Sequence, residues 1–238
     1  MIRTRGDGTV RVVTLDRPDR RNALRPRELT ALEAAVREAT EPVVYLRGAG
    51  EAFCAGADLD TVASLSDPAA FARHGQRVAR SIEESDAVVV AGVDGAARGG
   101  GVELALAADV RVATPDATFA EPGVRFGLFG AWGGTVRLPR VMGEGEALDF
   151  ALSGRVLDAD AALRTGLVSR VVANPRAVAD ELAGGKADAL RVVKRRLRDR
   201  GEAEEAGTAA DAAREAAEAE AFAELHRAHA EDLAGSRE

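Results

Sequence analysis

Residues 87–113 read AVVVAGVDGAARGGGVELALAADVRVA, and this stretch indicates the fold class more clearly than any other. Residues 87–93 form an apolar, valine-rich run that is typical of a strand buried on both faces. The triple glycine at 99–101 leads from this strand into an apolar segment that is expected to be helical, and residues 110–113 return to strand composition. A strand, a glycine turn, a helix and a second strand in succession predict an α/β protein.

The same alternation extends outward from this stretch. Further strands are expected at 10–16, 43–47 and 118–120, and helices at 26–40 and 67–85. Three segments rich in glycine or small residues are expected to be loops, at 48–60, 94–101 and 121–134. Helical patterns dominate from residue 135 onward, with one strand-like stretch at 167–172, so we expect an α/β core followed by a helical C-terminal part.

The triple glycine is also the first candidate for chemistry. A helix that begins there exposes unpaired backbone N–H groups and a partial positive charge. Gly100 and Glu103 are three residues apart and therefore share a helix face. Together they offer an anion-binding N–H and a carboxylate, which are the groups needed to stabilise an enolate and move a proton. The plainer interpretation is a tight turn followed by a surface glutamate.

A second candidate is the small-residue loop at 53–59, which follows a predicted buried strand and leaves its backbone open to a ligand. Its cysteine, Cys54, has no histidine near it in sequence, so we expect a small buried thiol rather than a nucleophile. None of the three histidines stands in a metal-binding pattern, so no metal site is expected. Nucleotide-binding glycine motifs of the P-loop and dinucleotide types do not occur.

Composition excludes several classes of protein. The 46% of hydrophobic residues among the 238 argues against disorder. The net charge of −7 disfavours a nucleic-acid partner. No apolar run approaches the length of a membrane span, and the first ten residues hold no signal-like apolar stretch, so we expect no membrane association and a cytosolic location.

The order of several motifs along residues 10–172 is similar to that of the crotonase superfamily, the enoyl-CoA hydratases and isomerases. The motifs are Asp16-Arg17-Pro18, Arg21-Asn22-Ala23-Leu24, Phe53-Cys54-Ala55-Gly56-Ala57-Asp58-Leu59, Gly99-Gly100-Gly101 with Glu103, Gly133-Gly134-Thr135, Leu152-Ser153-Gly154-Arg155 and the segment 161–168. The resemblance implies a crotonase-like spiral of ββα repeats over 1–174. It also implies a C-terminal helical region, 175–238, that drives assembly into a trimer or a hexamer.

The resemblance further implies an acyl-CoA thioester substrate, with CoA entering as part of the substrate and no separate cofactor. Two backbone N–H groups would hold the thioester oxygen, and by position these belong to Ala57 and Gly100. Glu103 would be the catalytic acid or base. The CoA moiety would lie along residues of two loops, namely Arg21, Ala23, Leu24, Ala55, Ala57, Asp58 and Leu59.

The chain departs from the family pattern at the acyl pocket. Similar hydratases carry a second glutamate where this chain has Gly123, and the family's Pro-Gly-x-Gly-Gly-Thr reads Gly130-Ala131-Trp132-Gly133-Gly134-Thr135. Glu121 stands two residues before Gly123. If this segment is extended, the two positions face the same side, so Glu121 is either a catalytic group or a surface residue.

We therefore expect an enoyl-CoA hydratase, with an isomerase or another single-carboxylate acyl-CoA reaction as the close alternative. A catalytically silent CoA-binding homologue is a further alternative, which the missing glutamate favours. With nothing at Gly123 to hold a water, hydration of crotonyl-CoA should be weak. Gly123→Glu should then increase it, if Trp132 leaves room for the added side chain.

Overall fold

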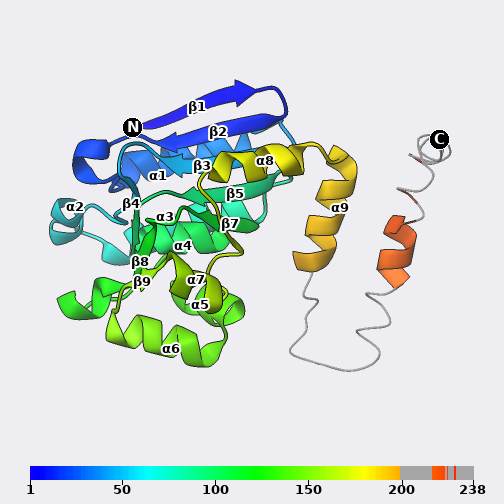
Figure 1. Ribbon diagram of the computed structural model, residues 1–238. Coiled ribbons are helices and arrows are strands. Elements are labelled where there is room, and N and C mark those ends of the chain that lie inside the picture. Colours follow the sequence, from blue (N-terminus) through cyan, green and yellow to red (C-terminus); the bar gives the residue numbers. More distant parts are fainter. Residues whose placement is uncertain (199–215, 223, 225–227, 229–238) are drawn as a thin grey trace. The chain divides into compact units, whose positions relative to one another are not determined.

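The computed structural model describes residues 1–198, 216–222, 224 and 228. Contacts divide the chain into two units, Met1–Gly184 and Gly185–Glu238, and both sheets belong to the first (Figure 1). In the second unit, α9 (Ala187–Arg198) is an amphipathic helix. The rest of the expected C-terminal helical region lies largely outside the described residues, so its role in assembly stays a prediction.

A six-stranded sheet carries the core of the first unit. Its order is β1 (Ile2–Asp7), β2 (Val10–Leu15), β3 (Val43–Gly48), β5 (Val88–Val93), β7 (Val110–Ala113) and β10 (Arg170–Val171). All neighbouring pairs are parallel except β1 and β2. All six residues of β5 are buried, as its apolar run predicts. The first strand was not predicted because it is an edge strand with five exposed residues, and it therefore lacks an apolar pattern.

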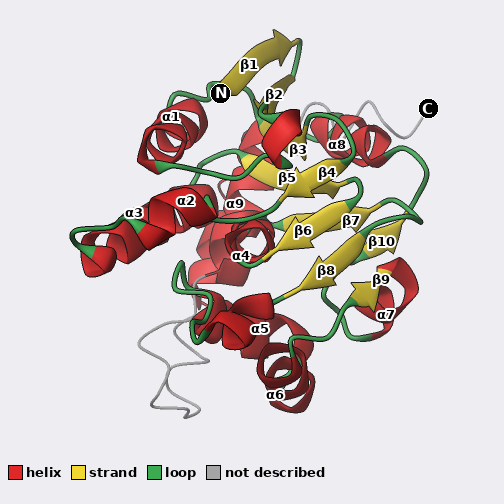
Figure 2. Ribbon diagram, turned by 90° about the vertical axis from the view of Figure 1, so that its left-hand side faces the viewer, coloured by secondary structure: helices red, strands yellow, loops and turns green. Residues whose placement is uncertain are grey.

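A second, smaller sheet was only partly predicted. Its order is β4 (Ala52–Cys54), β6 (Ala96–Arg98), β8 (Thr118–Ala120) and β9 (Leu157–Asp158). The expectation that 48–60 and 94–101 are loops throughout is wrong, because each contains a three-residue strand. These strands consist mainly of small residues and pair in parallel with one another, which single-chain periodicity over three positions does not reveal. Figure 2 shows β6 and β8 side by side in this sheet.

Helices cover the sheets. The first half of the unit contributes η1 (Pro18–Arg20), α1 (Pro26–Arg37), α2 (Leu59–Ala63), α3 (Pro68–Glu83) and α4 (Gly100–Ala107). The second half contributes η2 (Pro122–Phe126), α5 (Gly134–Met142), α6 (Glu144–Ser153), α7 (Ala159–Arg164) and α8 (Pro175–Ala183). The predicted helices 26–40 and 67–85 are confirmed as α1 and α3, with ends that differ by a few residues. Because α8 contacts β3 and β5, it belongs to the first unit, beyond the predicted boundary at 174.

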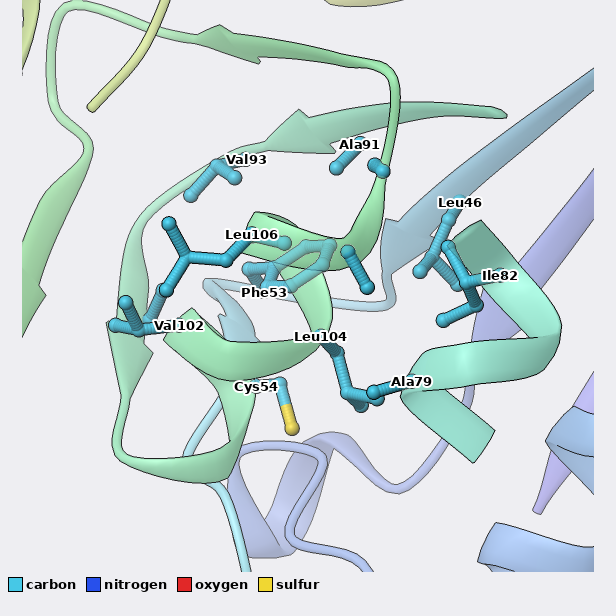
Figure 3. Packing of buried hydrophobic residues seen from close by; sticks show 14 of the residues in the cluster. Leu46, Phe53, Cys54, Ala79, Ile82, Ala91, Val93, Val102, Leu104 and Leu106 are labelled. Carbon is cyan, nitrogen blue, oxygen red and sulfur yellow. The ribbon is translucent and has the colours of Figure 1, made fainter. Parts of the chain in front are cut away.

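The central helix α4 is buried along its whole length, with all eight residues inside the core. Val102, Leu104 and Leu106 lie in one apolar cluster with Phe53 and Ile82 (Figure 3). A helix this apolar has no solvent face, so its position is set by packing against α3, α5, β4 and β6.

Each glycine of the triple motif is required for a different steric reason. Gly99 has a φ of +49°, in the left-handed region that glycine adopts readily. A Cβ on Gly100 would lie 2.3 Å from the Trp132 ring, and a Cβ on Gly101 would lie 2.2 Å from the carbonyl oxygen of Cys54. The motif therefore lets α4 approach both β4 and the indole more closely than any side chain would allow.

The turn between η1 and α1 is fixed by one buried polar side chain, Asn22. Its amide donates hydrogen bonds to the carbonyls of Ala49 (2.9 Å), Ala52 (2.7 Å) and Phe53 (3.2 Å). Its Oδ1 accepts one from the Arg17 N–H (2.9 Å). Asn22 also has a φ of +60°, which asparagine tolerates better than most residues. Asn22 thus connects the turn to the backbone just before β4, at Ala49, and within β4, at Ala52 and Phe53.

Replacing Asn22 should therefore be costly. Asn22→Gly keeps the left-handed backbone accessible but leaves buried carbonyls without donors, so it should lower the free energy of unfolding by about 1–3 kcal/mol. Asn22→Ala should cost about 1 kcal/mol more, because alanine disfavours a positive φ. Urea denaturation measures both, with the exposed Asp19→Ala as a neighbouring control. An Asn22→Gly protein as stable as wild type would contradict this role.

Candidate active site

Three loops of the site leave the carboxyl ends of three neighbouring parallel strands. Residue 55 follows β4, Gly99 follows β6 and Glu121 follows β8. Because parallel strands end at the same edge of a sheet, these loops are brought together although they lie far apart in sequence. The Gly99 N–H donates to the Ala120 carbonyl (3.0 Å), which holds the second and third loops in register.

The first two loops approach each other at backbone level. A Cβ on Gly56 would lie 2.9 Å from Gly100 N and 2.6 Å from the Arg98 carbonyl oxygen. Leu24 pairs with the backbone on either side of Ala57, through its own N–H to Gly56 O (2.8 Å) and the Asp58 N–H to Leu24 O (2.9 Å). The Ala57 N–H itself points away from Leu24 in this bridge, and the Gly100 N–H lies in the first turn of α4.

A cavity of about 240 Å³ lies beside these two loops. Ala57, Gly100, Glu103 and Glu121 all line it. The rest of its wall is mainly apolar and includes Leu65, Phe71, Phe126, Phe129 and Trp132. Two carboxyl groups in an otherwise apolar cavity are the kind of arrangement found at catalytic sites.

Glu103 is held by the loop that precedes α5. It is 1% exposed, and its Oε1 accepts hydrogen bonds from the N–H groups of Trp132 (2.8 Å) and Gly134 (2.6 Å). Burial raises the pKa of Glu103 to about 7, although the two amide donors and the charge of Arg137 act in the opposite direction. The side chain predicted to be the acid or base is thus buried, oriented and close to titration at neutral pH.

Glu121 also lines the cavity, which bears on the alternative left open by the sequence. It is 5% exposed, so the interpretation as a surface residue is wrong. The segment is not extended as assumed, because η2 begins at Pro122, yet the side chain still enters the cavity. Burial, and then the charge of Glu103, raise the pKa of Glu121 to about 8. Within the described part of the chain, its Oε1 has no hydrogen-bond partner.

Gly123 lines the same cavity but leaves no room for a side chain. A Cβ there would lie 2.9 Å from Phe129 Cα and 3.0 Å from the Leu128 carbonyl oxygen. Those are backbone atoms, which cannot move aside as the end of a side chain can. The expected gain from Gly123→Glu is therefore not supported, since the obstacle is the backbone at 128–129 rather than Trp132.

Trp132 is clamped between two helices. It is 3% exposed, and Cβ atoms added to Gly75 of α3 and Gly100 of α4 would each lie within 2.3 Å of its ring. Phe71 meets the indole edge-on, with ring centroids 5.9 Å apart. The tryptophan thus forms one wall of the cavity and supports the backbone of Gly100.

A second, shallower pocket of about 370 Å³ adjoins the cavity and shares Ala55, Ala57 and Leu59 with it. It is also lined by Arg21, Ala23 and Asp58, so the structure brings together most of the residues predicted to contact CoA. Leu24 is the exception, because its side chain is buried and only its backbone takes part in this region.

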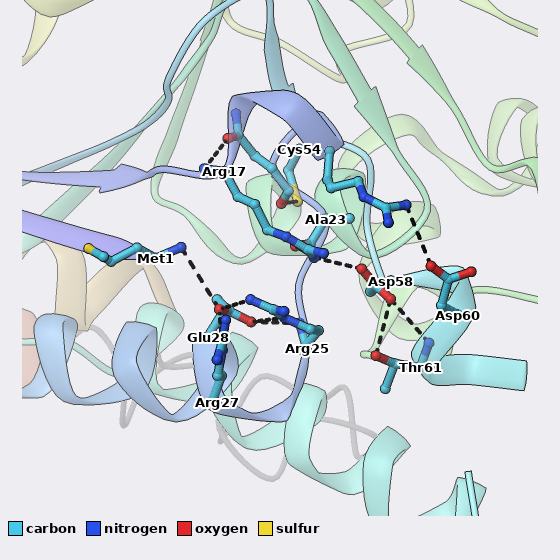
Figure 4. A network of polar contacts seen from close by, with 12 residues as sticks. Met1, Arg17, Ala23, Arg25, Arg27, Glu28, Cys54, Asp58, Asp60 and Thr61 are labelled. Carbon is cyan, nitrogen blue, oxygen red and sulfur yellow. Dashed lines mark hydrogen bonds and ion pairs between the residues drawn. The ribbon is translucent and has the colours of Figure 1, made fainter. Parts of the chain in front are cut away.

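Asp58 shapes this pocket through its carboxylate contacts. Its Oδ2 accepts a 2.6 Å hydrogen bond from Arg17, and its Oδ1 accepts two from Thr61, one of which caps α2 (Figure 4). These contacts hold the pKa of Asp58 below its usual value against the effect of burial. The side chain is thus fully engaged in fixing the loop that carries Ala57.

The expectations about Cys54 are confirmed. Its thiol is buried, and burial raises its pKa to about 12, so it carries negligible thiolate at neutral pH. Within the described part of the chain, no cluster of three or more His, Cys, Asp or Glu residues is arranged to hold a metal ion.

Comparison with known proteins agrees with this geometry. The family model for enoyl-CoA hydratase/isomerase matches residues 5–231. The chain belongs to the enoyl-CoA hydratase/isomerase family. A probable enoyl-CoA hydratase of Mycobacterium bovis is 34% identical over 198 residues, which cover 79% of this chain and 77% of that protein. The crotonyl-CoA hydratase of Syntrophomonas wolfei is 40% identical over 168 residues, covering 68% and 65%.

Solved structures show the same relationship. The enoyl-CoA hydratase of Thermoplasma volcanium superposes with a TM-score of 0.85 at 30% identity, covering 95% of this chain and 92% of that one. The crotonase-like fold and the assignment to a family of acyl-CoA enzymes are therefore confirmed. Among the helices that the structure describes, none is both long and apolar enough to cross a bilayer.

Sequence reasoning missed several cavity residues and underweighted one. Phe71 of α3 lines the cavity, and Gly75 of the same helix packs against Trp132. The apolar face of α3 predicts packing only, and nothing in α3 alone shows that this face meets Trp132. Glu121 was named as a candidate, and its position directly after a strand was the available signal that it would reach the site.

The two raised pKa values make stability depend on pH. Both folded-state values exceed the ordinary 4.5, so their contribution to stability is fully present below that pH and is lost as pH rises towards about 8. Glu121→Gln removes one ionisable group from the cavity. Its melting temperature should therefore gain on wild type as the pH rises from about 5 to 9. Thermal scans by circular dichroism measure this, and parallel curves for the two proteins would show that Glu121 ionises as freely as a surface carboxyl.

Proposed function

We propose that this protein hydrates 2-enoyl-CoA thioesters. The observation that supports the proposal is that Ala57, Gly100 and Glu103 line one mainly apolar cavity, beside a pocket that contains Arg21. The relatives named above as hydratases support the same reaction class.

The two amides are proposed to form an oxyanion hole. A thioester carbonyl is neutral in the substrate and becomes anionic when a nucleophile adds to the conjugated double bond. Backbone dipoles that are already in place then favour the transition state over the ground state, because they need no reorganisation. The N-terminus of α4 adds its partial positive charge to the same point.

Glu103 is proposed to act as the acid or base. Its pKa lies near neutral pH, where a carboxyl can both accept and return a proton, and its orientation is fixed by two amide donors. The CoA moiety is proposed to occupy the shallower pocket, with the exposed Arg21 guanidinium available to its phosphates and the acyl chain pointing into the cavity.

The remaining expectations are proposals about the cellular protein. The reaction needs no cofactor, since CoA arrives with the substrate. A homotrimer or hexamer in the cytosol is proposed from the family resemblance. Exposed apolar side chains on and around α6 support an assembled form, among them Leu148 and Leu152. Light scattering coupled to size-exclusion chromatography tests the assembly.

Glu103→Gln should lower the hydration rate by about 10²–10⁴-fold. Glutamine keeps the shape and can accept from the Trp132 and Gly134 amides, but it cannot take a proton. Loss of the enone absorbance of crotonyl-CoA measures the reaction, and the exposed Glu51→Gln is a matched control. If Glu103→Gln hydrates crotonyl-CoA within a few-fold of wild type, Glu103 is structural.

A spectroscopic prediction isolates the oxyanion hole from the proton transfer. When butyryl-CoA labelled with ¹³C at its carbonyl binds, the infrared carbonyl stretch should move to lower frequency, because two N–H donors polarise the bond. The Glu103→Gln protein should show the same shift, since its amides are intact. A bound carbonyl that absorbs as in water would place the thioester elsewhere.

The same assay separates the alternatives. A change in the enone absorbance, with mass spectrometry showing that the CoA product has gained no water, would identify an isomerase. Binding of butyryl-CoA without turnover of any enoyl-CoA would identify a silent homologue.

A further inference from the structure

We propose that Glu121 is the second catalytic carboxyl of this enzyme, in place of the glutamate missing at Gly123, and that Gly130 provides the space in which it and Glu103 share one water. The inference rests on the proposed hydratase function. It treats two departures of this chain from its family pattern, at 123 and 130, as one coordinated change that involves the neighbouring Glu121.

The two carboxyl groups face the same small space. A Cβ on Gly130 would lie 2.9 Å from Glu103 Cδ and 3.0 Å from Glu121 Oε2. That point is empty of protein atoms only because residue 130 is a glycine. Glu103 Oε1 lies 3.1 Å and Glu121 Oε2 lies 3.0 Å from that point, so the two oxygens are no more than about 6 Å apart. One water between them, beside the Gly130 Cα, could hydrogen-bond to each carboxyl.

The family pattern has proline at position 130, and a proline carries a Cβ. In this chain such a Cβ would press on both carboxyls at once. A glutamate at 123 would in turn meet the backbone of Leu128 and Phe129. The loop is therefore arranged for a carboxyl from position 121 and not from position 123.

The hydrogen bonds of Glu103 and Glu121 favour different protonation states for the two carboxyls. Glu103 Oε1 already receives two amide N–H groups, which favour its ionised form. Glu121 is buried, and its Oε1 has no hydrogen-bond partner among the residues that the structure describes. A buried oxygen without a partner is costly to retain unless something else completes it, so this one points to a water or a substrate atom.

The position of Glu121 after β8 also determines which part of the site its carboxyl lies in. It follows β8 directly, and β8 pairs with β6, whose own continuation carries Gly99 and Gly100. The carboxyl is thus attached to the same sheet edge as the amides. A group that must meet the α-carbon of a thioester held by those amides is well placed there.

The resulting addition balances. Ionised Glu103 takes one proton from the shared water, whose oxygen bonds to the β-carbon while the double-bond electrons pass to the thioester oxygen. Protonated Glu121 then gives its proton to the α-carbon as the enolate collapses. Transfer of the proton now on Glu103 to Glu121 restores the starting pair, so the net change is addition of H and OH across the double bond.

Two variants test the assignment independently. Glu121→Gln removes the proton donor, and it should lower kcat for hydration of crotonyl-CoA by about 10²–10⁴-fold with little change in KM. Gly130→Ala keeps both glutamates but adds a methyl group within 3.0 Å of atoms of both carboxyls, which must then shift from their positions around the shared water. It should also lower kcat by at least about 10-fold, since a displaced catalytic group loses its geometry.

Matched controls keep the result interpretable. Glu51→Gln changes an exposed carboxyl, and Gly145→Ala adds a methyl group at a helical glycine with nothing within 4 Å. Both should retain wild-type kcat. Circular dichroism checks that each variant is folded. If Glu121→Gln does not fold, Gly130→Ala still tests the assignment.

The outcomes separate the two proposals. Loss of kcat in Glu121→Gln and in Gly130→Ala, with active controls, supports the pair. Full hydration by folded Glu121→Gln, while Glu103→Gln is inactive, overturns the role of Glu121 and leaves the hydratase function standing. A wild-type protein that hydrates no enoyl-CoA from four to ten carbons overturns the proposed function and this inference with it.

Discussion

The site depends on one geometric constraint, the side-by-side ending of β4, β6 and β8. Their carboxyl ends deliver Ala57, Gly100 and Glu121 to the same edge from positions separated by more than 60 residues in total. The strands are only three residues long, so they contribute little stability by themselves. They are held instead by α4, whose glycines allow it to pack directly on β4, and by Asn22, which satisfies the carbonyls around the β4 entry.

A second constraint is electrostatic. Two carboxyls in an apolar cavity cannot both ionise without a large desolvation cost. The structure resolves this asymmetrically, with amide donors given to Glu103 and none to Glu121 Oε1. The asymmetry separates the roles of two chemically identical groups. It also means that the folded state gives up some stability near neutral pH to keep both groups in the cavity.

Much of this could be predicted from the sequence, and the failures have physical causes. The valine-rich β5, the glycine motif and the position of Glu103 are encoded locally, in apolar runs and in the spacing of Gly100 and Glu103. The strands β4 and β6 are not encoded locally. Three residues are too few to show an alternating hydrophobic pattern, and these strands form only by pairing with strands distant in sequence. Edge strand β1 was missed for a different reason. Five of its residues are exposed, so its sequence resembles that of a polar loop.

The cavity illustrates where local reasoning stops. The family pattern predicts a carboxylate where this chain has Gly123, but the sequence could not show that the backbone of Leu128 and Phe129 occupies the space that a side chain there would need. Glu121 stayed an open alternative because an extended segment was assumed there, whereas a 3₁₀ helix begins at Pro122. Distance from a strand end is the better guide, since the sheet edge determines which side chains reach the amides. In this chain Glu121 directly follows β8 and lines the cavity, although a 3₁₀ helix begins at the next residue.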